Sequence, residues 1–346
     1  MDFSKQLVLW YLQNKRDLPW RNDKNPYNIW LSEIILQQTR ISQGTPYYHK
    51  FINKYPAISD LAAADEDEVL KLWQGLGYYS RGRNLHHTAR YITTYYNGIF
   101  PDDFKTLIKL KGIGDYTASA ISSICFNKPH ATVDGNVQRV LARFFNIDIP
   151  VNSNKGVKYF KQLAQELLDT TDPGTHNQAV MELGALICTP KNPDCTHCPL
   201  QEACEALKHK TTGVLPVKEN KIRRRKRFFN FLVFDIQNTS TLLIKRTQKD
   251  IWQNLYQFPV IESEEEIDRE NILKSDLLKI YTDDKEIKIS LYNSKNLLHK
   301  LTHQDIHIRF WIVSTQSSVK NSIEWKNVTN FAVPVPIDNF IKSYQK

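Results

Sequence analysis

The first two-thirds of the chain consists of apolar stretches with helical spacing, separated by short polar connections. In the segment WLSEIILQQTR (30–40), the apolar residues and Gln38 recur every three or four positions, which predicts a helix with these residues on one face. Glu33 and Gln37 share another face of this helix. Because most acids on a helix are solvated surface residues, the pattern alone assigns no function to Glu33.

Two later stretches repeat the helical spacing. Ser153 is the predicted N-cap of a helix that runs to about residue 169, with Val157 among its inward residues. A further helix is predicted over about 177–187. We therefore predict an all-helical domain over residues 1–212.

The pattern changes after residue 212. The segment GVLPVKENKIRRRKR (213–227) has neither helical nor strand period and ends in a run of basic residues, which predicts a linker. The stretches FFNFLVFDI, TLLIKR and IHIRFWIV then alternate or run apolar over strand lengths, with an acidic, helix-compatible insert (about 262–279) between them. We therefore predict a second domain of mixed α and β structure over 228–346.

The net charge and the distribution of apolar residues indicate what the protein binds and where it is found. The 346 residues carry a formal charge of +9, which makes a polyanion such as nucleic acid a plausible partner. No run of about eighteen apolar residues occurs, and the N-terminus has no signal-peptide pattern, so we expect no membrane partner and a soluble, intracellular protein. The compact N-terminus favours a bacterial cytoplasm, in which we expect a nucleoid-associated monomer.

The stretch 110–140 combines a glycine turn with an acid. It opens LKGIGDYTA, where Gly112 and Gly114 allow a tight turn and the close approach of a partner, and it ends in VDGNVQRV, which places Asp134 beyond the next helix. The amides after the turn open a helix, and a helix N-terminus favours a phosphate. The stretch fits a device that grips a nucleic-acid backbone, although a lone glycine turn is more often an ordinary connection between core helices.

A second candidate contact is the segment GLGYYSRGRNLHH (75–87). Its tyrosines are interleaved with arginines, a combination that suits base stacking and phosphate contact. A turn between two helices whose tyrosines cap a core explains the same pattern equally well.

Four cysteines lie close together near the end of the helical domain. Cys188, Cys195, Cys198 and Cys204 are separated by six, two and five residues, and prolines among them force turns. In an intracellular protein such a group indicates a metal site rather than disulfides. Four thiolates bind either zinc or an iron–sulfur cluster, and the spacing by itself does not choose between them.

Taken together, these motifs resemble the MutY family of adenine DNA glycosylases, in the helix-hairpin-helix superfamily that includes endonuclease III. The matching pieces occur in family order; they are LPWR (18–21), SEIILQQTR (32–40), WQGLGYYSRGRNLH (73–86), LKGIGDYTA (110–118), VDGNVQRV (133–140), MELGALIC (181–188) and the four-cysteine loop. The resemblance implies two helical lobes with double-stranded DNA bound between them, and a 4Fe–4S cluster rather than zinc at the four cysteines.

The resemblance also implies a catalytic pair. Glu33 matches the general acid that protonates the departing adenine, and Asp134 matches the carboxylate that stabilises the positively charged sugar. Asn136 would position Asp134 or a water molecule. Tyr116 stands where members that also cut the strand carry a lysine, and because a phenol forms no Schiff base, the resemblance implies base removal without strand cleavage.

Other matching residues are implied to contact DNA. Trp20, Arg21 and Gln178 match the pocket for an adenine swung out of the duplex, which the reaction requires because the bond is out of reach inside the stack. The remaining matches are Leu76 and Tyr78, as wedges in the duplex, and Gln38 and Thr39, near the opposite base.

The last third resembles a Nudix-like (MutT-like) domain of this family. The segment DIWQNLYQFPVIE (250–262) is similar to its opening, but the glycine-containing acidic box of Nudix hydrolases is absent, so we expect a binding module. Family members recognise 8-oxoguanine with a Phe-Ser-His loop, whose counterpart here is Leu301, Thr302 and His303. The missing aromatic side chain leaves the strength of lesion recognition open.

We therefore predict a monofunctional adenine DNA glycosylase of base excision repair that acts on adenine opposite 8-oxoguanine or guanine. An endonuclease III-like glycosylase and lyase for oxidised pyrimidines is the rival enzyme, disfavoured by Tyr116 and the extra domain. A noncatalytic iron–sulfur DNA-binding protein is the rival of another class, and it would require Glu33 or Asp134 to be idle.

Overall fold

The computed structural model describes residues 3–219, 224–282 and 287–344, which divide into two compact units. The first unit comprises Met1–Ala63 and Asn84–Asn220, and the second comprises Ala64–Arg83 and Lys221–Lys346. In the described part of the chain, no helix is long and apolar enough to cross a membrane.

The first unit is helical, as predicted. Its elements are α1 (Phe3–Asn14), η1 (Pro19–Arg21), α2 (Pro26–Leu36), α3 (Ile41–Lys54), α4 (Ile58–Ala63), α6 (Ser80–Tyr96, which begins in the second unit), α7 (Phe104–Leu107), α8 (Asp115–Phe126), α9 (Gly135–Phe144), α10 (Asn154–Glu166), α11 (Pro173–Leu186), η2 (Cys195–His197), η3 (Gln201–Ala203) and α12 (Glu205–Lys208).

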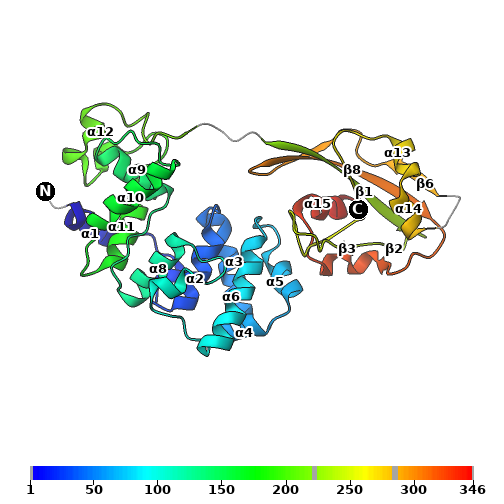
Figure 1. Ribbon diagram of the computed structural model, residues 1–346, viewed down its shortest axis with the longest axis horizontal. Coiled ribbons are helices and arrows are strands. Elements are labelled where there is room, and N and C mark those ends of the chain that lie inside the picture. Colours follow the sequence, from blue (N-terminus) through cyan, green and yellow to red (C-terminus); the bar gives the residue numbers. More distant parts are fainter. Residues whose placement is uncertain (1–2, 220–223, 283–286, 345–346) are drawn as a thin grey trace. The chain divides into compact units, whose positions relative to one another are not determined.

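Helix α11 is the central element of this unit, since it packs against α1, α8 and α9 (Figure 1). The core around it contains fully buried Leu7, Leu141, Phe160 and Leu183. Burying one side chain of this size contributes roughly 1.5–3 kcal/mol to the stability of the folded state. The helix starts are fixed locally, because Asp134 caps α9 and Ser153 caps α10 through side-chain acceptors.

The glycine turn between α7 and α8 requires glycine at its first position. Gly112 has a φ of +81°, and a Cβ there would lie 2.7 Å from the Cβ of Asn84. Around Gly114 a Cβ would meet nothing within 4 Å, so the backbone is open to a partner. The turn then leads directly into α8.

The second unit is a mixed α and β structure, as predicted. Its elements are α5 (Glu66–Trp73), β1 (Arg225–Ile236), β2 (Ser240–Thr241), β3 (Ile244–Lys245), β4 (Tyr256–Gln257), β5 (Val260–Ser263), α13 (Arg269–Lys274), α14 (Asp276–Tyr281), β6 (Lys288–Leu291), β7 (Leu297–Lys300), β8 (Gln304–Thr315), β9 (Ile323–Glu324), η4 (Trp325–Asn330) and α15 (Val335–Tyr344).

Two long parallel strands, β1 and β8, form the centre of its sheet (Figure 1). They pair in register from Arg225 and Gln304 to Ile236 and Thr315, and β6, β7 and β5 add antiparallel partners. A tight turn at residues 301–303 connects β7 to β8, so it lies at the end of the sheet where β1 begins.

The segment Ala64–Arg83 belongs to the second unit through side-chain contacts that are distant in sequence. Lys245 pairs with Asp67 (2.5 Å between Nζ and Oδ1), and the Gln74 amide donates to Asp338 (2.9 Å). The unit is therefore assembled from two pieces of the chain.

The structure differs from three of the local predictions. Gln38 follows the end of α2 with a φ of +55°, so it does not share a helical face with the apolar residues. Val157 is 52% exposed, because the buried stripe of α10 runs instead through Gly156, Phe160 and Ala164. Residues 225–227 belong to β1 rather than to the predicted linker, since their backbone pairs with β8.

Candidate active site

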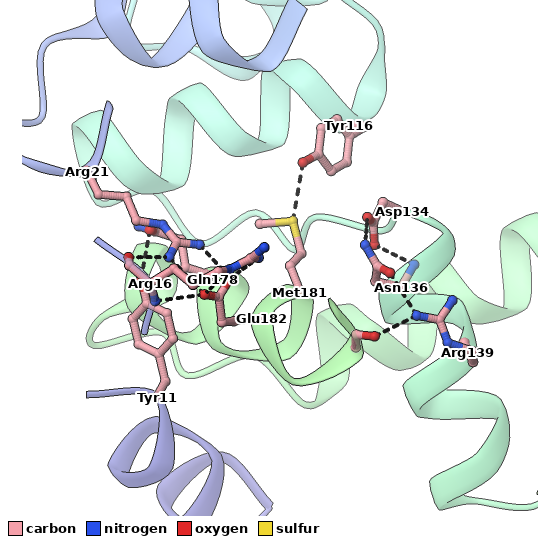
Figure 2. A network of polar contacts seen from close by, with 11 residues as sticks. Tyr11, Arg16, Arg21, Tyr116, Asp134, Asn136, Arg139, Gln178, Met181 and Glu182 are labelled. Carbon is pink, nitrogen blue, oxygen red and sulfur yellow. Dashed lines mark hydrogen bonds and ion pairs between the residues drawn. The ribbon is translucent and has the colours of Figure 1, made fainter. Parts of the chain in front are cut away.

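Three polar side chains from separate helices converge in the first unit: Glu33 of α2, Tyr116 of α8 and Asp134 at the N-cap of α9. Burial of the Glu33 carboxyl raises its pKa from 4.5 to about 7; the Tyr116 hydroxyl opposes this rise, while the charge of Asp134 adds to it. In this structure the Tyr116 hydroxyl donates to the sulfur of Met181 (3.2 Å; Figure 2). Burial and the two carboxylates raise the pKa of Tyr116 well above its ordinary value, so this phenol keeps its proton.

Asp134 accepts hydrogen bonds from three donors. Its Oδ1 accepts from the backbone amides of Asn136 (2.9 Å) and Val137 (2.8 Å), and its Oδ2 accepts from the Asn136 side-chain amide (2.8 Å). Burial raises the pKa of Asp134 above its ordinary value, and the donors at the start of α9 offset only part of this rise. The two acids therefore have different environments, one with three hydrogen-bond donors and one dominated by burial.

A chain of hydrogen bonds runs from Asp134 through Asn136 to Arg139 (Figure 2), and Arg139 continues it to the cysteine loop. The side-chain oxygen of Asn136 accepts from Arg139 Nη2 (2.8 Å), and Arg139 Nε donates to the backbone oxygen of Cys188 (2.7 Å). A Cβ on Gly184 of α11 would lie 2.7 Å from that of Asn136, so only glycine permits this approach of α11 and α9.

A second polar network surrounds Glu182 of α11 (Figure 2). Arg16 and Arg21 donate to both Glu182 oxygens at distances from 2.7 to 3.2 Å, and only 1% of the Glu182 side chain is exposed. Burial would raise the Glu182 pKa, but the two arginines lower it to about 2. The Arg21 guanidinium lies over the Tyr11 ring, with its Cζ 5.6 Å from the ring centroid, and the Tyr11 hydroxyl donates to the Gln178 side chain (2.9 Å).

Two of the three predicted pocket residues, Arg21 and Gln178, lie close to each other. Arg21 and Gln178 are joined through Tyr11, and Arg21 is near enough to Glu33 to lower its pKa. Trp20 is buried and packs edge-on against the Tyr48 ring (5.2 Å between centroids).

Gln38 and Thr39 lie in the turn after α2, where Gln38 is exposed. Their neighbour Gln37 donates to Thr117 of α8 (3.3 Å). This contact places the turn close to the start of the helix that carries Tyr116.

Predicted contacts in the second unit meet at one cavity of about 720 Å3. Tyr78 is 47% exposed and its hydroxyl lies 2.5 Å from that of Thr302, although the two residues are 224 positions apart. His303 is exposed beside it, in the turn 301–303, which we call the recognition turn. Leu76 lines the cavity but is only 6% exposed, so in this structure it does not project as a wedge.

The four predicted metal ligands line one common cavity in the first unit. The Arg143 guanidinium lies beside them, 3.4 Å from the sulfur of Cys188. Within residues 3–219, 224–282 and 287–344, no group of three or more His, Cys, Asp or Glu side chains is arranged to hold a metal ion. The four thiols therefore surround one common cavity.

Sequence reasoning missed two residues of this site. Glu182 follows Gln178 by four positions, so the shared helical face was the signal that could have identified it. Arg139 lies within the matched motif VDGNVQRV, but its bonds to Asn136 and Cys188 depend on the packing of α9 against the cysteine loop.

Comparisons with known proteins agree with this architecture. The family model described as "HhH-GPD superfamily base excision DNA repair protein" matches residues 31–170, and the model of the NUDIX domain matches residues 231–343. The predicted helix-hairpin-helix and Nudix-like fold classes are thereby confirmed.

Relatives cover both units. The adenine DNA glycosylase of Buchnera aphidicola (subsp. Baizongia pistaciae) is 36% identical, with 99% of this chain and 97% of that protein aligned. The mouse adenine DNA glycosylase is 45% identical over 62% of this chain and 43% of its own length. A solved thermostable thymine-DNA glycosylase superimposes with a TM-score of 0.55 at 30% identity, over 60% of this chain and 95% of that one. From its motifs, its two domains and its full-length relatives, this chain belongs to the family of adenine DNA glycosylases, enzymes of base excision repair.

Proposed function

We propose that the protein removes adenine paired with 8-oxoguanine or guanine by hydrolysing the N-glycosidic bond, and that it leaves an abasic site. The observation that carries this proposal is the unequal environment of Glu33 and Asp134. Breaking this bond requires a proton for the leaving base and a negative charge beside the oxocarbenium-like sugar. One protonated and one ionised carboxyl supply both.

Glu33 is the proposed acid. With a pKa of about 7, close to half of its carboxyl groups hold a proton at neutral pH. Transfer of that proton to the adenine ring makes the base a neutral leaving group. The Tyr116 hydroxyl, which keeps its own proton, orients the Glu33 carboxyl.

Asp134 is the proposed stabiliser of the sugar cation. The three donors at the start of α9 favour its ionised form and fix its direction. Water then adds to the sugar carbon and gives up a proton to the Glu33 carboxylate, which restores the acid. Because no amine replaces the phenol at position 116, no Schiff base forms and the reaction stops at the abasic site.

The arginine network around Glu182 supports an adenine pocket. Glu182 holds the Arg21 guanidinium through two hydrogen bonds (3.2 and 2.9 Å), and Gln178, joined to Arg21 through Tyr11, adds a polar side chain, while Trp20 is buried against Tyr48 in this structure. Such a pocket is suited to an extruded purine, which is recognised by its polar edge and by stacking.

The cavity at Tyr78 supports recognition of the base opposite adenine. Tyr78 offers an exposed aromatic ring, and Thr302 and His303 offer a hydroxyl and an imidazole. Replacing both Thr302 and His303 by Ala should reduce the preference for 8-oxoguanine over guanine opposite adenine. An unchanged ratio of single-turnover rates would count against this assignment.

The four cysteines fit a 4Fe–4S cluster. All four thiols line one cavity, and the Arg143 guanidinium beside Cys188 offsets the negative charge of thiolates. With four protein ligands the cluster keeps no open position for substrate, so its proposed role is to order the loop. A brown protein with about four irons is expected; a colourless protein with one zinc would refute the cluster.

The function is tested with a duplex that contains one 8-oxoguanine:adenine pair. We expect strand cleavage only after hot alkali, which reveals an abasic site. Cleavage without alkali would indicate the glycosylase and lyase, and absence of cleavage would indicate the noncatalytic binder. Glu33→Gln should abolish excision without loss of duplex binding, whereas the matched control Glu264→Gln, at an exposed acid, should leave it unchanged.

A further inference from the structure

A cluster of four charged side chains lies at the end of the sheet where β1 begins: Arg227, Arg246, Asp250 and Glu262. Arg227 donates to both oxygens of Glu262 (2.5 and 2.7 Å) and to both oxygens of Asp250 (3.0 and 2.6 Å). Arg246 donates to Asp250 as well (2.5 Å). Only 7% of each arginine side chain is exposed, whereas the Asp250 and Glu262 side chains are 27% and 36% exposed, so two buried cations are held by two partly exposed anions.

Arg227 and Asp250 of the cluster stay ionised at neutral pH. Burial alone would lower the pKa of Arg227, but its bonds to Glu262 and Asp250 raise it above the ordinary value. A buried ion network is weak evidence for stability, because desolvation offsets the attraction between the charges. Its arrangement is nevertheless strict, since displacement of one partner would leave a buried charge unpaired.

Arg227 also reaches a residue outside the cluster. Its Nη1 donates to the side-chain oxygen of Gln304 (2.8 Å), the first residue after the recognition turn. The turn is closed by the Leu301 amide, which donates to the Gln304 carbonyl (2.8 Å), and the neighbouring Arg225 amide donates to the His303 carbonyl (3.0 Å). The C-terminal end of the recognition turn is thus held by β1 through one backbone bond and through the Arg227 guanidinium.

The same guanidinium holds the opposite wall of the cavity. Asp250, bound by Arg227, begins the segment 250–252, and the Trp252 ring of this segment contacts the His299 ring (5.7 Å between centroids). Segment 250–252 and the recognition turn both line the cavity of about 720 Å3 that contains Tyr78. A single buried side chain therefore connects the two walls.

We propose that Arg227 is a positioning residue for specificity: through Gln304 and Asp250 it fixes the recognition turn, and thereby sets the preference for the base opposite adenine. This inference rests on the proposed function of that turn. Arg227 does not itself contact DNA in this account. A planar guanidinium with five donors can bind three acceptor groups at once, which a lysine ammonium cannot do with the same geometry.

The link is tested at Gln304, because Arg227→Met would remove the hydrogen bonds of Glu262 and two of those of Asp250 together, and could prevent folding. Gln304→Leu removes only the bond between the cluster and the recognition turn. Gln304→Glu restores an acceptor for Arg227. Each full-length variant is measured under single turnover at saturating enzyme, on 8-oxoguanine:adenine and on guanine:adenine duplexes, together with its Tm.

We expect Gln304→Leu to reduce the ratio of the two rates about tenfold, as for the loss of one hydrogen bond to a charged group. Gln304→Glu should keep a ratio near that of the natural protein. The control Gln316→Leu, at an exposed position just beyond the other end of β8, should change neither rate.

Two results would overturn the inference alone: an unchanged ratio in Gln304→Leu, or an equal reduction in the Leu and Glu variants. A fall of both rates together with Tm, at a constant ratio, would mean a purely structural role and would also overturn it. If the natural protein itself shows no preference between the two duplexes, the proposed recognition function fails first and the inference fails with it.

Discussion

The raised pKa of Glu33 makes a quantitative prediction about stability. An acid whose pKa is 4.5 when unfolded and about 7 when folded keeps its proton in the folded state over a range in which the unfolded chain has released it. Raising the pH through this range therefore favours unfolding. The full difference of about 2.5 pKa units corresponds to roughly 3.4 kcal/mol.

Replacing Glu33 by Gln removes this penalty and keeps the shape of the side chain. The natural protein carries a penalty of roughly 0.8 kcal/mol at about pH 5 and roughly 3.3 kcal/mol at about pH 8. The stability of Glu33→Gln relative to the natural protein should therefore increase by about 2.5 kcal/mol between these two pH values. A gain in stability with a loss of activity is the expected trade-off if this buried carboxyl is the proposed acid.

The measurement is urea unfolding of both proteins at the two pH values, followed by a probe in the first unit. Glu264→Gln, at an exposed acid of the second unit, serves as the control and should show no pH-dependent difference. If Glu33→Gln gains no stability relative to the natural protein as the pH rises, the pKa of Glu33 is not raised in the folded protein. The assignment of Glu33 as the acid then loses its physical basis.

Three further predictions concern the chemistry and its support. The single-turnover excision rate should fall about tenfold per pH unit above pH 7, as Glu33 loses its proton; a flat profile to about pH 9 would contradict this. Tyr116→Lys should gain strand cleavage, and a folded, excising variant that forms no borohydride-trapped DNA adduct would refute the role of this position. Gly184→Ala should destabilise the protein by roughly 1–3 kcal/mol and slow excision, because its Cβ would meet Asn136 at 2.7 Å. Gly213→Ala, where a Cβ meets nothing within 4 Å, should do neither.

The sequence predicted those parts of the site that depend on local pattern. The position of Glu33 on a helix and the cap by Ser153 follow from the residues within one turn, and the structure has them there. Val157 was assigned inward because apolar spacing does not say how wide the buried stripe is, and it is exposed.

The parts that sequence reasoning missed depend on partners far along the chain. Arg227 ends a basic run, which favours a solvated linker, yet it is buried because Asp250, in the loop between β3 and β4, and Glu262 of β5 approach it. Glu182 is compensated by Arg16 and Arg21, more than 160 positions earlier. Burial of a charge can be inferred only when its counter-charge is known, and no spacing rule supplies that.

The composition of the second unit has a consequence for how this protein can be divided. Ala64–Arg83 lies inside the helical two-thirds of the sequence, yet its side chains bind Lys245, Thr302 and Asp338. A polypeptide cut within 213–227 would carry this segment without its partners. The first two-thirds and the last third of the chain are thus not independent modules. An exchange of either piece between relatives would have to preserve the contacts of Ala64–Arg83 with the last third. In this protein, the two pieces of the chain that build the second unit would have to be inherited together.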